Sequence, residues 1–181
     1  MYKDSIELLK KNNVTFEKGL SADEILQIEK QYDISFPTSL RKFLMTELPV
    51  SKGFYNWRNF DIENIKYIKN MIKQPIQYIN DMPQEIYWCE DWGKEPENLE
   101  SFKDEVKKRL AKAPKLIPIY SHRYMPMLDN ENPPIISVHG GDVIYMGKDL
   151  YDYFMVEYGS KKQTEISFSS IKSIPFWSDI M

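Results

Sequence analysis

The stretch from Leu116 to Gly147, LIPIYSHRYMPMLDNENPPIISVHGGDVIYMG, constrains the fold of this chain more than any other segment. Short apolar runs alternate in it with short polar segments that contain proline or glycine, which predicts strands separated by tight turns. We expect strands near Leu116–Tyr120, Ile135–Val138 and Val143–Met146. Gly140-Gly141 predicts a hairpin turn, because glycine adopts positive φ angles without steric cost. An antiparallel sheet therefore belongs at the centre of the fold.

Helical patterns surround this segment on both sides. Ser21 and Glu24 have the spacing of a capping box, which predicts a helix that begins there. Pro37 suits the first turn of a further helix, since its missing N–H costs nothing at that position. Apolar residues recur at helical spacing in further segments: Ile6 and Leu9; Leu40, Phe43 and Leu44; Ile62, Ile65, Ile68 and Ile72; Leu99, Phe102, Val106 and Leu110; and the stretch Leu150 to Tyr158. We therefore expect one α+β domain over residues 1–181, a mostly antiparallel sheet packed with N-terminal and flanking helices.

Four smaller features refine this expectation. Pro75 predicts a kink or an end in the helix that begins after Asp61. The aromatic stretch Gly53–Phe60 is turn-like and compatible with a short strand. Ile86–Cys89 and the pair Ile166 and Phe168 predict two more short strands.

Composition excludes several classes of protein. The chain of 181 residues has a formal net charge of −3, whereas a general nucleic-acid binder carries a basic excess. Its single cysteine cannot form an intramolecular disulfide, which favours a reducing compartment. No apolar run approaches the ~18 residues of a membrane span, and the N-terminus lacks the apolar core of a signal peptide. We expect a cytoplasmic protein that binds neither membrane nor nucleic acid directly.

Histidine and cysteine are the residues to examine for chemistry. The chain has two histidines, His122 and His139, and one cysteine, Cys89. It has no C-x-x-C, H-x-x-x-H or H-E-x-x-H pattern, so we expect no metal and no cofactor. A Cys–His nucleophile pair is formally available, but the neighbouring Glu90 disfavours the thiolate. We expect no catalytic residue, with His122 at a turn at the end of a strand and His139 at the end of another.

The segment from Asp81 to Glu105 is acidic and aromatic. It contains nine carboxylate side chains but only two basic ones, Lys94 and Lys103, and tyrosine and tryptophan are interspersed with the acids. One interpretation is a solvated face with the tryptophans in the core. The other is a surface that docks on a basic partner, with aromatic anchors and acids that accelerate association. On that interpretation the partner-binding residues are Glu85, Tyr87, Glu90, Asp91, Trp92 and Glu95.

The order of several short motifs resembles the SUKH superfamily, which includes a yeast regulator of cell-wall synthesis and killer-toxin resistance. The motifs extend from Gly19 to the C-terminus: Gly19-Leu20-Ser21, Glu24-Ile25, Glu29, Phe36-Pro37, Phe43-Leu44, Trp88, Trp92-Gly93, Pro96, Leu116-Ile117-Pro118-Ile119-Tyr120, His122-Arg123-Tyr124-Met125-Pro126, Asn132-Pro133, Ser137-Val138-His139, Asp142-Val143-Ile144-Tyr145, Gly147, Phe176-Trp177 and Asp179.

The resemblance implies an α+β binding scaffold without catalytic residues. Bacterial members are commonly immunity proteins that neutralise a cognate polymorphic toxin, and many such toxins are nucleases. The leading hypothesis is therefore a cytoplasmic immunity protein whose partner is a toxin with a basic active-site cleft. The alternatives are a regulatory scaffold in cell-envelope signalling and a small hydrolase that uses Cys89 or clustered carboxylates.

Overall fold

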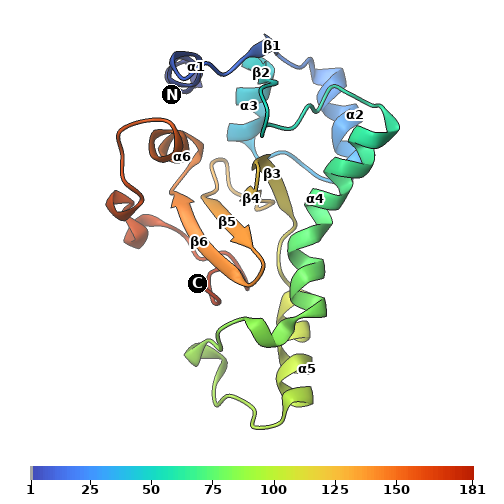
Figure 1. Cartoon of the computed structure of the whole chain (residues 1–181), viewed down its shortest axis with the longest axis vertical. Helices are drawn as coiled ribbons and strands as arrows, with labels where there is room; N and C mark the ends of the chain where they lie inside the picture. Colours follow the sequence, from blue (N-terminus) through green and yellow to red (C-terminus); the bar gives the residue numbers. More distant parts are fainter. Residues whose placement is uncertain (1) are drawn as a thin grey trace.

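Four antiparallel strands form the central sheet, in the order β3-β4-β5-β6 (Figure 1). The strands are β3 (Leu116–Tyr120), β4 (Arg123–Pro126), β5 (Ile135–His139) and β6 (Asp142–Gly147). Each strand pairs with the next in the sequence. The computed structural model describes residues 2–181. The three predicted strands are confirmed, and β4 is an additional one. The hairpin at Gly140-Gly141 is also confirmed, because His139 pairs with Asp142 and Gly140 has a φ of +64°.

The N-terminal part is a helical unit with a small sheet of its own, at the top of Figure 1. It contains α1 (Tyr2–Lys11), α2 (Ala22–Tyr32) and α3 (Thr38–Thr46), while β1 (Phe16–Lys18) pairs antiparallel with β2 (Glu47–Pro49). The predicted capping box is confirmed: the Glu24 amide donates to Ser21 Oγ, and the Ser21 amide donates to the Glu24 carboxylate. Pro37 stands one position earlier than predicted, as the residue that caps α3.

A long helix, α4 (Ile62–Asp81), runs from the N-terminal unit along the sheet towards α5 (Leu99–Leu110) at the opposite end of the molecule (Figure 1). The alternative that this helix ends at Pro75 is wrong, because the helix continues to Asp81. Proline removes one backbone hydrogen bond from a helix interior. Ile72 and Ile79 are buried on either side of Pro75, so packing of this helix face compensates for that loss.

Residues 53–60 are turn-like as expected and do not form the alternative short strand, although an isolated bridge joins Phe54 to Tyr120. The two short strands predicted near residues 86–89 and 166–168 are wrong. Residues 86–89 lie between two 3₁₀ turns, η1 (Pro83–Glu85) and η2 (Glu90–Trp92). Ile166 directly follows the 3₁₀ turn η3 (Gln163–Glu165), and Phe168 begins the next one, η4 (Phe168–Ser170). Ile86 and Ile166 are nevertheless buried, so these apolar residues anchor loops to the core individually and do not pair with a sheet edge.

The central sheet is covered on both faces. Alternate strand residues enter two different apolar clusters: Ile117, Met125 and Ile135 pack with the N-terminal helices and α6 (Leu150–Glu157). Their neighbours Leu116, Tyr124 and Ile136 pack with the end of α4, α5 and the C-terminal segment. Burial of both faces explains why the strands contain nearly continuous apolar runs. No helix among residues 2–181 combines the length and hydropathy needed to cross a membrane.

Candidate functional site

A cleft of about 640 Å³ opens between α4, the η1 turn and the β5–β6 hairpin. Clefts of this size are common at ligand-binding sites. The side chains that carry chemistry in its lining are Tyr78, Glu85, Tyr87, His122, His139 and Asp142. Three segments far apart in the sequence therefore contribute to one concave surface.

The fold brings the two histidines together. His122 precedes β4 and His139 ends β5, and these neighbouring strands are antiparallel, so the two rings lie side by side with centroids 5.6 Å apart. The amide of Val138 donates to the carbonyl oxygen of His122 at 3.1 Å, which fixes the backbone here. Partial burial lowers the pKa of His122, and the charges of Arg123 and His139 lower it further, while Glu157 opposes them.

The two carboxylates of the cleft, Glu85 and Asp142, differ in their partners. The hydroxyl of Tyr78 donates to the Glu85 carboxylate, and this bond raises the pKa of Tyr78. Asp142 is exposed opposite His139 and has no ion pair among residues 2–181. No group of three or more His, Cys, Asp or Glu in that range has the arrangement of a metal site. The cleft therefore presents acceptor groups without metal-ligand geometry.

Two glycines fit the hairpin tip against the other wall of the cleft. A Cβ at Gly140 would lie 3.2 Å from the ring of Tyr78. A Cβ at Gly141 would lie 2.8 Å from the carbonyl oxygen of Glu85, closer than real Cβ contacts allow. The hairpin is therefore in direct contact with α4 and the η1 turn.

The six predicted partner-binding residues fall into two groups. Glu85 and Tyr87 line the cleft, whereas the other four lie in and after η2. Glu90, Asp91 and Glu95 are exposed and have no ion pair in the described part of the chain. They form what we call the acidic segment surface.

Trp92, the sixth predicted residue, is only partly exposed. Its ring stacks on Phe176 with centroids 6.0 Å apart, and the guanidinium of Arg109 lies 4.7 Å from it. Its Nε1 donates to Asp179 at 3.0 Å. Trp92 thus fastens the acidic segment to α5 and to the C-terminal segment, at the edge of the core and not within it.

Cys89 lies outside the lining of the cleft that holds the histidine pair. Its side chain is partly buried. Cys89 therefore does not contribute to the histidine-lined cleft.

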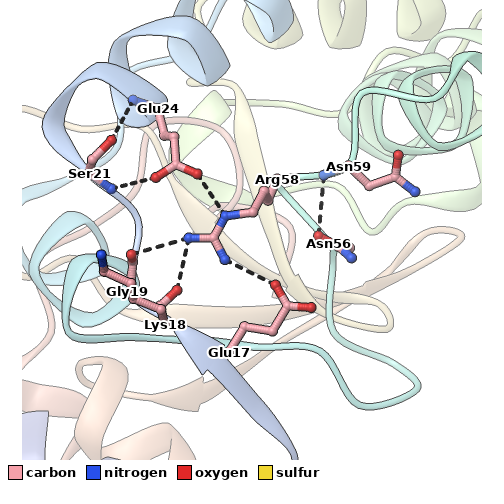
Figure 2. A network of polar contacts seen from close by, with 8 residues as sticks. All are labelled: Glu17, Lys18, Gly19, Ser21, Glu24, Asn56, Arg58 and Asn59. Carbon is pink, nitrogen blue, oxygen red and sulfur yellow. Dashed lines mark hydrogen bonds and ion pairs between the residues drawn. The ribbon is translucent and has the colours of Figure 1, made fainter.

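A second polar cluster joins the start of α2 to the loop before α4 (Figure 2). Arg58 donates to Glu24 at 2.7 Å, to Glu17 at 3.0 Å and to two backbone carbonyls, those of Lys18 and Gly19. The hydrogen bond from Arg58, followed by that from the Ser21 amide, lowers the pKa of Glu24 to about 2. Because these groups satisfy one another, we assign them a structural role.

Gly19 completes this junction. A Cβ at this position would overlap the carbonyl oxygen of Met45, so the β1–α2 connection can approach α3 only with glycine. The motif Gly19-Leu20-Ser21 with Glu24 is therefore a folding motif that holds the N-terminal unit together.

The same junction marks the beginning of the match to a known family. The family model described as SMI1/KNR4 family (SUKH-1) matches residues 19–170. The chain belongs to the SUKH-1 family. That family includes immunity proteins of polymorphic toxin systems. No curated protein and no solved structure gives a significant match to the chain. Phe176-Trp177 and Asp179, which also carried the resemblance, lie beyond the matched residues.

Sequence reasoning did not group the histidines with Glu85 and Tyr87. The two-residue hairpin signals only that His139 lies opposite Asp142; no local signal places either residue beside Glu85 and Tyr87. A strand after His122 would have added the second histidine, but the proline and methionine residues of RYMP concealed β4.

Proposed function

We propose that this SUKH-1 chain is an immunity protein that acts in the cytoplasm, where it binds a toxin protein and blocks the active site of that toxin. The proposal involves no catalysis by the chain itself. The toxin is expected to have a basic cleft, as nucleases do because their substrates carry phosphates.

The observation that carries this proposal is the acidic segment surface. Glu90, Asp91 and Glu95 are exposed and have no ion pair among residues 2–181, so their charge is available to a partner. Unpaired charge of one sign increases the association rate with a surface of the opposite sign.

The support beneath this surface strengthens the proposal. Trp88 and Trp92 contact each other edge to face at 5.2 Å, and Trp88 Nε1 donates to the carbonyl oxygen of Gly93 at 2.8 Å. The acidic residues are therefore presented on an ordered loop. Less conformational entropy is lost when such a loop binds its partner.

Growth protection tests the proposal. The open reading frames adjacent to this chain's gene are searched for a toxin domain; that domain is expressed alone and together with the chain, and growth is measured. We expect the chain to restore growth and to copurify with the toxin domain. Absence of both a complex and protection would refute the immunity function.

A charge-matched pair of variants tests the surface. Replacement of Glu90, Asp91 and Glu95 by lysine should abolish protection. The control replaces Glu7, Glu63 and Glu131, three exposed acids elsewhere, with the same change in net charge. Equal protection by both triple variants would show that the toxin binds another surface.

A further inference from the structure

The cleft has a chemical character of its own, distinct from the acidic segment surface. Its lining contains the carboxylates of Glu85 and Asp142 but no lysine or arginine. A neutral histidine ring has one acceptor nitrogen, so His122 and His139 each add an acceptor in that form. The cleft therefore offers acceptors and negative charge to whatever enters it.

Aromatic faces accompany these acceptors. Tyr87 is 82% exposed, the highest value among the large hydrophobic side chains that the structure describes, and Tyr78 lies on the facing helix α4. An exposed aromatic side chain beside carboxylates matches a planar cation, which stacks on the ring while its N–H groups donate to oxygen. The guanidinium of arginine has this shape, whereas a lysine ammonium is a compact point charge.

We propose that the cleft between α4, η1 and the β5–β6 hairpin binds the guanidinium group of an arginine side chain from the partner protein. Glu85 and Asp142 accept its hydrogen bonds, and Tyr87 covers its face. This inference takes only the class of partner, a basic protein, from the proposed immunity function.

The Glu85 carboxylate and the backbone that carries Asp142 are positioned before the arginine arrives. Gly141 lies against the backbone of Glu85, so Asp142, the next residue, is held close to the η1 turn. Tyr78 donates to the Glu85 carboxylate and restricts it. The backbone of Asp142 is fixed by its pairing with His139 in the hairpin. Such preorganisation reduces the entropy lost on binding.

A small-molecule probe tests the cleft without any toxin. N-acetyl-arginine amide is titrated into the full ¹⁵N-labelled chain at pH 7.5, and amide resonances are followed by NMR. We expect saturable shifts at Gly140 and Gly141. N-acetyl-citrulline amide, which has nearly the same shape and no charge, should leave these resonances in place. Equal shifts from the two probes, or no saturable shift from either, would overturn the proposal.

Variants locate the site. Asp142→Asn and Glu85→Gln each keep an acceptor oxygen and remove a charge, and the double variant should bind the arginine probe about tenfold more weakly. Glu131→Gln, at an exposed site outside the cleft, should bind it as the unmodified chain does. An unchanged affinity in the double variant would overturn the assignment.

The probe and the toxin give separable answers. If the arginine probe binds at the hairpin but the neighbouring toxin is neither bound nor neutralised, the immunity function fails and the cleft assignment stands. If the toxin is neutralised but the probe does not bind, the cleft assignment fails and the immunity function stands.

Discussion

Gly141 packs directly against Glu85, whose carbonyl oxygen lies where a Cβ at position 141 would come within 2.8 Å. This contact joins the β5–β6 hairpin to the η1 turn and connects two segments far apart in the sequence. It also determines how closely the walls of the cleft approach each other. The hairpin glycines thus serve turn geometry and packing together.

Replacement of Gly141 by alanine should destabilise the chain through this contact. Insertion of a methyl group into a tightly packed position costs about 1–3 kcal/mol. The free energy of unfolding in urea measures the loss. Asp142→Ala, at an exposed neighbouring position of the same hairpin, is the control and should change the free energy of unfolding by less than about 0.5 kcal/mol. Unchanged stability of Gly141→Ala would show that the hairpin moves aside freely.

Trp92 should matter to stability far more than Tyr87 does. Trp92→Ala removes contacts with Phe176 and Arg109 and the hydrogen bond to Asp179. Because the ring is partly exposed, we expect a loss of about 2–3 kcal/mol, at or below the lower end of the values for buried aromatics. Tyr87→Ala, at an 82% exposed site, should change the free energy of unfolding by less than about 0.5 kcal/mol. Similar losses in the two variants, measured in urea, would contradict this assignment.

The sequence predicted the elements whose signals are local. The capping box at Ser21, the helix after Asn98 and the Gly140-Gly141 turn depend on neighbouring residues, and all three are confirmed. Apolar periodicity within these segments then determined which face is buried. Local rules were sufficient here because few other backbone conformations provide the same capping hydrogen bonds and turn geometry for these residues.

The elements that sequence reasoning missed depend on distant partners. β1 and β2 have three residues each and exist because Phe16–Lys18 pairs with Glu47–Pro49. β4 depends on β3 and β5 for its backbone hydrogen bonds. Apolar residues near Ile86 and Ile166 resembled strands, since a loop anchor and a strand residue are equally apolar. The cleft was missed for the same reason, because it is assembled from α4, η1 and the hairpin.

The ion pair between Glu24 and Arg58 should make the free energy of unfolding decrease as the pH falls into the acid range. The pKa of Glu24 is lowered from 4.5 to about 2, so its contribution is complete above pH 4.5 and is lost as the pH falls through about 2. Arg58→Gln should cost about 1 kcal/mol at pH 7, given that both side chains are partly exposed.

Urea unfolding at several pH values from 7 to 2 checks this sign. The difference between the unmodified chain and Arg58→Gln should shrink as the pH falls. Lys94→Gln is the control, because the ion pair between Lys94 and Glu97 is almost fully exposed and should contribute little at any pH. A difference that is constant across this range would mean that Arg58 acts through its backbone hydrogen bonds alone.

His122 should titrate below the ordinary value of histidine. Partial burial lowers its pKa, Arg123 on β4 and His139 on β5 lower it further, and Glu157 on α6 raises it. The unfolded chain therefore takes up this proton first as the pH falls through 6.5, and stability decreases until the pH passes the folded pKa. NMR titration of the imidazole Cε1–H resonance measures the pKa directly. His139→Gln removes one of the nearby charges, so the pKa of His122 should rise towards 6.5. A pKa at or above 6.5 in the unmodified chain would contradict the burial and charge arrangement described for the cleft.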